Sequence, residues 1–115
     1  MSRRGVAVSR ASADALRVLG NQIRLARHAR GWTIADLAAR IDASRRTIVN
    51  IESGAPTVSI GTVFNAAFTV GVNLFGLEGP ELARARRQGE DTLALLPSKV
   101  RKPASREEDD DDLAF

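Results

Sequence analysis

The chain has 115 residues, of which 43% are hydrophobic, 27% are charged and none is cysteine. A chain of this length builds one small domain, and the lack of cysteine excludes disulfides and thiolate metal sites. No apolar run approaches the roughly 18 residues of a membrane helix, and no apolar segment of the kind found in secretory signals follows the N-terminal arginines. We therefore expect a cytoplasmic protein that does not span a membrane.

The net charge of +3 combines two parts of opposite sign. Residues 1–102 contain 16 Lys and Arg against 8 Asp and Glu, a balance of +8, whereas residues 103–115 contain 1 Arg against 6 acidic residues, a balance of −5. A basic body attracts a polyanion, and an acidic end is repelled by one. Ordinary solvated surface charge explains the asymmetry equally well, so charge alone leaves both interpretations open.

The N-terminal third of the chain predicts an arm followed by two helices. Residues 1–12 lack helical periodicity and predict a flexible basic arm. Over residues 14–30 apolar side chains recur at helical spacing, which predicts an amphipathic helix that ends at Gly31. Thr33 then caps a second predicted helix, with Asp36 three residues later as the acid of a capping box.

A tight corner separates the second predicted helix from the third. Asp42, a residue that tolerates the left-handed conformation, marks this corner. Ser44 caps the third helix, Ile48 and Ile51 form its buried side, and Gly54 ends it.

The helical pattern weakens toward the C-terminus. Ser59 predicts the cap of a fourth helix that ends at Gly71, and residues 73–77 allow a short fifth helix. Residues 81–96 form a further possible helix, and the acidic run 107–112 predicts disorder. The expected all-α protein has four parts, namely an arm (1–12), a domain (13–79), an extension for dimer or partner contact (80–102) and an acidic tail (103–115).

The third predicted helix carries the candidate functional residues. Helical spacing places Arg45 and Arg46 on its first turn and Asn50 one turn later, away from the apolar side. Arginine donates two hydrogen bonds to guanine, and asparagine pairs similarly with adenine. The simpler interpretation is that both arginines are solvated residues of an ordinary helix. The preceding helix and corner favour base contacts, because such a unit fixes its second helix on the DNA backbone.

Polar and basic residues around this unit are candidates for contacts with DNA phosphates. They are Thr33, Ser44, Thr47, Arg24, Arg27, Arg40 and Lys99. Whether the arm at residues 1–12 reaches the minor groove stays open.

Apolar, capping and basic residues of this region recur at a characteristic spacing: Leu19, Ile23, Arg24, Arg27, Gly31, Trp32, Thr33, Leu37, Ala38, Ser44, Thr47, Ile48, Ile51, Glu52 and Gly54. Through them residues 19–74 resemble the Xre family of helix-turn-helix domains, relatives of lambdoid phage repressors. The resemblance implies a five-helix, lambda-repressor-like domain that binds a palindromic double-stranded DNA operator as a homodimer, with base contacts at Arg45, Arg46 and Asn50. Two positions depart from the family, which often has glutamine at Ile34 and glycine at Asp42.

The segments VSIGTVFNAAFTVGV (58–72) and LALLPSKVRKP (93–103) are similar to antitoxins of the HipB type. This resemblance implies a transcriptional repressor that pairs with a HipA-like kinase toxin and represses its own operon. The alternative is a stand-alone Xre-type regulator without a toxin partner.

Other surfaces complete the expectations. The dimer contact is assigned to Leu74, Phe75 and Leu77, and the apolar tip of the tail, Leu113 and Phe115, is a candidate for partner docking or else part of a solubilising end. The single histidine has no second ligand at metal spacing. No Ser/His/Asp set or Gly-rich phosphate loop is present, so we expect neither an enzyme nor a cofactor or metal.

Overall fold

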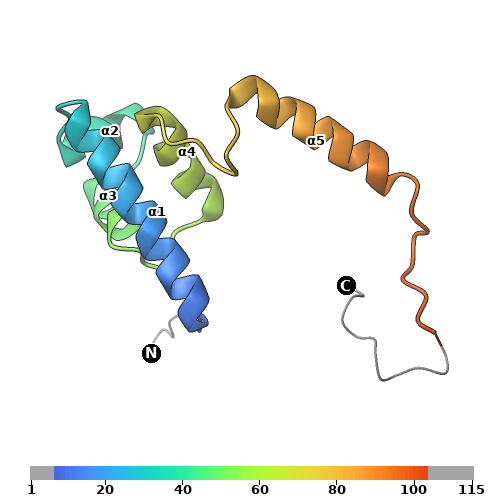
Figure 1. The fold of residues 1–115 in the computed structure, drawn as a ribbon. Coiled ribbons are helices and arrows are strands. Elements are labelled where there is room, and N and C mark those ends of the chain that lie inside the picture. Colours follow the sequence, from blue (N-terminus) through green and yellow to red (C-terminus); the bar gives the residue numbers. More distant parts are fainter. Residues whose placement is uncertain (1–6, 104–115) are drawn as a thin grey trace. The chain divides into compact units, whose positions relative to one another are not determined.

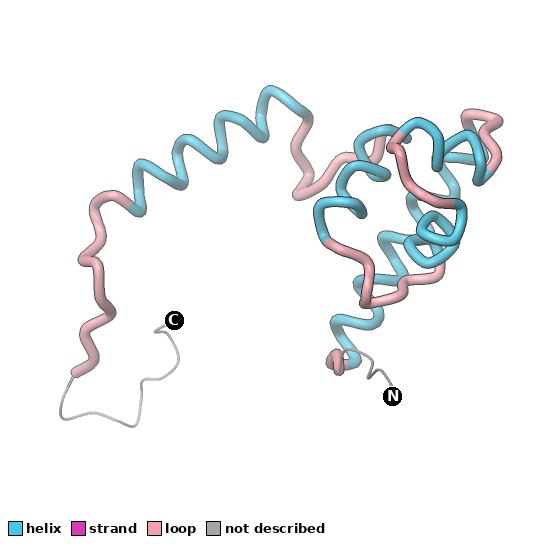
Figure 2. The backbone as a smooth tube through the Cα atoms, turned by 180° about the vertical axis from the view of Figure 1, so that it is seen from behind, coloured by secondary structure: helices cyan, strands magenta, loops and turns pink. Residues whose placement is uncertain are grey.

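The structure, a computed structural model, describes residues 7–103. Within them it has five helices and no strand, as the cyan and pink segments of Figure 2 show, which confirms the all-α, five-helix expectation. The helices are α1 (Arg10–Ala29), α2 (Ile34–Arg40), α3 (Arg45–Glu52), α4 (Ile60–Val70) and α5 (Gly79–Leu93). Expectations for residues 1–6 and 104–115, including Leu113 and Phe115, lie outside the described residues.

The described chain divides into two compact units, and the boundary falls between Gly76 and Leu77. Helices α1 to α4 belong to the first unit (Figure 1), and α5 belongs to the second. The second unit has no buried side chain on its helix. The packed core of the described chain therefore lies in the first unit.

Four helices contribute to this core. Its largest fully buried side chains are Ile23 of α1, Leu37 of α2 and Ile48 of α3. Burying each such side chain stabilises the fold by about 1.5–3 kcal/mol, so the short helices α2 and α3 are held mainly by packing. The remaining core residues are Ala38, Ile51, Val63, Ala66, Ala67, Val70 and Leu74.

Helix α1 approaches the end of α3 at a glycine. A Cβ atom at Gly20 would lie 2.6 Å from the carbonyl oxygens of both Ile51 and Glu52. Only a residue without a side chain allows the two backbones to come this close. This contact fixes where α3 lies on α1.

Helix α1 begins earlier than the expected residue 14. The Ser9 hydroxyl accepts a hydrogen bond from the backbone N–H of Ser12 at 3.0 Å, and the helix starts at Arg10. The last residues of the expected arm, 10–12, are therefore helical. Their side chains are exposed, so they show no apolar periodicity that the sequence pattern could reveal.

The short helix expected at residues 73–77 is absent, and a turn takes its place. The fifth helix is α5, which starts at Gly79 with Pro80 in its first turn. Glu81 accepts a hydrogen bond from the backbone N–H of Glu78 at 2.9 Å and so caps this start. The Gly79-Pro80 pair begins a helix here rather than ending one, because proline fits the first helical turn.

Candidate nucleic-acid interface

The start of α2 is fixed by a reciprocal pair of hydrogen bonds. The Thr33 hydroxyl accepts from the backbone N–H of Asp36 at 3.0 Å, and the Asp36 carboxylate accepts from the backbone N–H of Thr33 at 2.8 Å. The expected capping box is thus confirmed. The backbone hydrogen bond from Thr33, and then its side chain, lower the pKa of Asp36 from its ordinary value.

The corner between α2 and α3 has the conformation expected from the sequence. Asp42 adopts a left-handed backbone with φ of 56°, and the N–H of Ala43 donates to the carbonyl of Ala38 at 2.9 Å. Ser44 follows and its hydroxyl accepts from the backbone N–H of Thr47 at 3.1 Å. These local bonds end α2, reverse the chain and start α3 within a few residues.

The core fixes the rotation of α3 about its own axis. Ile48 and Ile51 are buried on the inner side, and the outer side presents Arg45 and Arg46, which are both exposed. Asn50 follows one turn later and is half-buried. The structure therefore brings the three residues expected to contact bases together on one short helix, with both arginines on its first turn.

Arg27 does not have the position expected of a phosphate contact. Its Nε and one terminal nitrogen donate to the two carboxylate oxygens of Glu52, at 2.7 and 3.0 Å. Its other terminal nitrogen donates to the carbonyl of Trp32 at 2.9 Å. The hydrogen bonds with Glu52 raise the pKa of Arg27, and both side chains are only 6% exposed. Arg27 is thus a structural residue that joins α1 to α3, and it is unavailable to DNA.

Two further arginines surround the single tryptophan. The guanidinium carbon of Arg40 lies 3.9 Å from the centre of the Trp32 ring, and that of Arg30 lies 5.1 Å from it. Arg30 also donates to the carbonyl of Val70 at the end of α4. Such cation–π contacts orient the guanidinium groups without neutralising them. Arg40 and Arg24 are exposed, and their charges face solvent.

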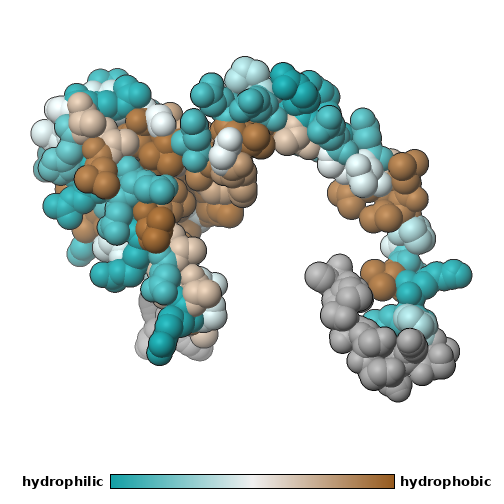
Figure 3. All heavy atoms as spheres, viewed as in Figure 1, coloured by the Kyte–Doolittle hydropathy of each residue, from teal (hydrophilic) through white to brown (hydrophobic). Residues whose placement is uncertain are grey.

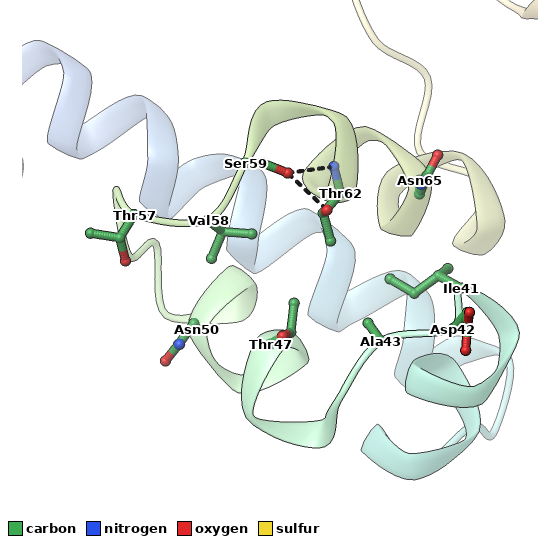
Figure 4. A pocket seen from close by; sticks show the side chains of 10 residues that line it. All are labelled: Ile41, Asp42, Ala43, Thr47, Asn50, Thr57, Val58, Ser59, Thr62 and Asn65. Carbon is green, nitrogen blue, oxygen red and sulfur yellow. Dashed lines mark hydrogen bonds between the residues drawn. The ribbon is translucent and has the colours of Figure 1, made fainter.

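An open pocket of about 350 Å³ lies beside α3, where α4 begins (Figure 4). Its lining is mainly polar and includes Thr47 and Asn50 of α3 together with Thr57, Ser59 and Thr62. The Ser59 hydroxyl caps α4 by accepting from the backbone N–H of Thr62 at 3.3 Å. Sequence reasoning identified Ser59 as a cap but missed the pocket, because its lining comes from the corner, α3 and the start of α4, which meet only in the folded domain.

The three residues assigned to the dimer contact differ in burial and do not all belong to the same unit. Leu74 is buried in the core and cannot meet a partner, which corrects that assignment. Phe75 is exposed, and Leu77 is half-buried and belongs to the second unit. Lys99 is exposed in that second unit as well.

Within residues 7–103, no three His, Cys, Asp or Glu side chains stand where they could hold a metal ion. The described helices include none that combines the length and apolar character needed to cross a membrane.

Comparison with known proteins identifies the family. A family model described as a helix-turn-helix domain matches residues 18–85, which include α2, the corner and α3. Neither the search of curated proteins nor that of solved structures gave a match. The matched region covers more than half of the chain and contains the geometry described above. The protein therefore belongs to this helix-turn-helix family and is a DNA-binding protein.

Proposed function

We propose that the protein is a transcriptional repressor that binds a double-stranded DNA operator sequence-specifically through α3. One observation carries the proposal: Arg45 and Arg46 are exposed on the first turn of a helix that is held in the core by the buried Ile48 and Ile51. A helix held in this way enters the major groove with its N-terminal side chains against the base edges. The partial positive charge of its N-terminus adds to the attraction for DNA.

Residues around α3 support contacts with the sugar–phosphate backbone. The Thr33 hydroxyl lies at the start of α2, and those of Ser44 and Thr47 lie at the start of α3. Phosphate oxygens are readily bound at such helix starts. Arg24 and Arg40 are exposed and add positive charge. Such contacts fix the position of the protein on DNA, whereas Arg45, Arg46 and Asn50 specify the sequence.

The protein acts on a palindromic operator as a homodimer in this proposal. Two copies related by a twofold axis place their recognition helices in successive major grooves, about 34 Å apart. Each half-site is then read by one α3, and the two α3 helices run in opposite directions because the twofold axis relates them.

The repressor is also proposed to be the antitoxin of a HipA-like kinase toxin. The support is the similarity of residues 58–72 and 93–103 to HipB-type antitoxins. In addition, Leu93, Leu95 and Leu96 are exposed at the C-terminal end of α5, where Figure 3 shows apolar side chains gathered, and such a surface suits a protein partner. Leu113 and Phe115 at the acidic tip are proposed as a second contact. The alternative is a stand-alone Xre-type regulator.

Two experiments test the antitoxin proposal. A kinase encoded beside this protein should co-purify with the full chain, and removal of residues 107–115 should weaken that complex if the tip is a contact. A neighbouring kinase that fails to bind the full chain would leave the stand-alone regulator as the correct function.

The operator proposal is tested by selecting bound sequences from random duplex DNA and measuring affinities at one salt concentration. Arg45→Ala, Arg46→Ala and Asn50→Ala should each lose about 1–3 kcal/mol on the selected sequence and relax the base preference at one position. The matched control is Arg86→Ala, which removes an exposed arginine of α5. Equal losses on selected and random DNA for the three α3 variants would contradict base reading.

A further inference from the structure

Helix α3 has three exposed side chains, and one of them is apolar. Arg45 and Arg46 are exposed on the first turn, and Val49 follows at the start of the second turn, where it is 39% exposed. The remaining residues of the helix are buried or half-buried. Val49 therefore shares the outward surface of α3 with the two arginines that the proposed function assigns to base contacts.

Helical geometry places Val49 between these two arginines in rotation about the helix axis. At about 100° per residue, position 49 lies about 40° around the axis from position 45 and about 60° from position 46. It also lies about 6 Å along the axis from position 45, which is roughly one turn. The floor of a DNA groove that meets both arginines therefore covers Val49 as well.

Val49 contributes little to the fold. The core cluster of the described residues takes Ile48 and Ile51 from α3, but neither that cluster nor the half-buried side chains packed against it include Val49. Valine is also a weaker helix former than alanine, so it gives an eight-residue helix no local advantage. Neither packing nor helix propensity explains an apolar, β-branched side chain at this position.

The chemistry of the major groove identifies a partner for such a side chain. Valine has no hydrogen-bond donor or acceptor, so it cannot pair with the polar atoms on the base edges. Against those atoms it would exclude water and leave them unpaired, which weakens binding. Thymine is the one base that presents an apolar group in this groove, the methyl group on C5. Contact between this methyl group and Val49 removes apolar surface of both partners from water.

We propose that Val49 recognises thymine in the operator by contacting its C5 methyl group, beside the bases that Arg45 and Arg46 contact. This inference rests on the proposed function and deepens it, because it adds a specificity-determining residue to the same helix. Arginine hydrogen bonds favour guanine. Helix α3 then selects guanine by hydrogen bonds and a neighbouring thymine by apolar contact.

The test removes the methyl group from the DNA and the side chain from the protein independently. In the selected operator each thymine is replaced in turn by deoxyuridine, which lacks only the C5 methyl group, and the affinity of the full chain is measured at one salt concentration. One such position in each half-site should weaken wild-type binding about fourfold, the effect of leaving one methyl group uncovered. Val49→Ser, whose helix propensity is similar, should bind the thymine and deoxyuridine duplexes equally.

The matched control is Val18→Ser, which changes a valine of α1 that is 55% exposed. This variant should keep the wild-type difference between the thymine and deoxyuridine duplexes. A deoxyuridine effect that persists undiminished in Val49→Ser would arise in the DNA itself and would overturn the contact.

Arg45→Ala and Arg46→Ala, measured on the same duplexes, separate the thymine contact from the proposed function. If both arginine variants relax the base preference while the wild type binds every deoxyuridine duplex like the parent, the Val49 contact is wrong and operator reading stands. A wild type without any base preference would reject the operator proposal, and the thymine contact with it.

Discussion

Arg27 and Glu52 form a two-point ion pair between the last turn of α1 and the last residue of α3. The two nitrogen–oxygen distances are 2.7 and 3.0 Å, and the remaining terminal nitrogen of Arg27 bonds the carbonyl of Trp32, just before α2. One side chain therefore joins α1 to α3 and to the residue before the cap of α2. The orientation of α3 depends on a charge that never meets DNA.

Removing one member of this pair should be costly. Glu52→Ala leaves the Arg27 guanidinium buried without its counter-charge, and we expect a loss of about 3–5 kcal/mol in the free energy of unfolding. The double variant Arg27→Met/Glu52→Leu should regain most of this, because no buried charge remains. Urea denaturation of the wild type, Glu52→Ala and the double variant measures both effects. A cost for Glu52→Ala below about 1 kcal/mol would show that the pair behaves like an exposed one.

The close approach of α1 to α3 makes a second prediction. Gly20→Ala places a methyl group 2.6 Å from two backbone oxygens that belong to Ile51 and Glu52, so the helices must separate. We expect a loss of about 1–3 kcal/mol in unfolding free energy, as for other overpacked sites. Gly61→Ala in α4 is the control, since a Cβ there meets nothing within 4 Å and alanine favours helices. Equal stability of the two variants would mean that the approach is looser than described.

The capping box of α2 should make stability depend on acid. The pKa of Asp36 is lowered in the folded protein, chiefly by the backbone N–H of Thr33, so its carboxylate stabilises the fold above the ordinary pKa of 3.8. That contribution is lost as the pH falls through the lowered value. Thermal melts of wild type and Asp36→Asn should therefore differ at neutral pH and converge in acid. A difference that stays constant across this range would show that the carboxylate charge is not involved.

The exposed arginines near α3 should control the salt dependence of DNA binding. Arg24→Ala and Arg40→Ala should each reduce the slope of log affinity against log salt by about 0.9 if each side chain neutralises one phosphate. Base preference should stay unchanged, unlike in the Arg45→Ala variant. Arg87→Ala, a change at an exposed arginine of α5, serves as the control. Unchanged slopes for both variants would remove Arg24 and Arg40 from the interface.

Features that depend on neighbouring residues were predictable from the sequence. Thr33, Ser44 and Ser59 cap the helices expected of them, and Asp42 has the left-handed backbone expected at the corner. Each of these features is decided by hydrogen bonds or steric limits within a few residues. The apolar spacing of Ile48 and Ile51 similarly determines which side of α3 is buried, and so which side carries the arginines.

Features that depend on distant residues were not predictable in this way. Arg27 and Glu52 are 25 positions apart, and nothing in the local pattern of Arg27 distinguishes it from the exposed Arg24. Leu74 and Phe75 are adjacent apolar residues, yet Leu74 enters the core and Phe75 faces solvent. The reason is that the chain turns at Phe75 and Gly76, which both have positive φ. Tertiary packing decides both cases.

The side of α3 that folds the domain and the side that faces outward share no residue. Ile48 and Ile51 hold the helix in the core, whereas Arg45 and Arg46 contribute nothing to that core. Under the proposed role of α3, mutation at the two arginines therefore alters which operators are recognised while the scaffold stays intact. Related proteins would then change their regulatory targets by single substitutions, and each variant along the way would still fold.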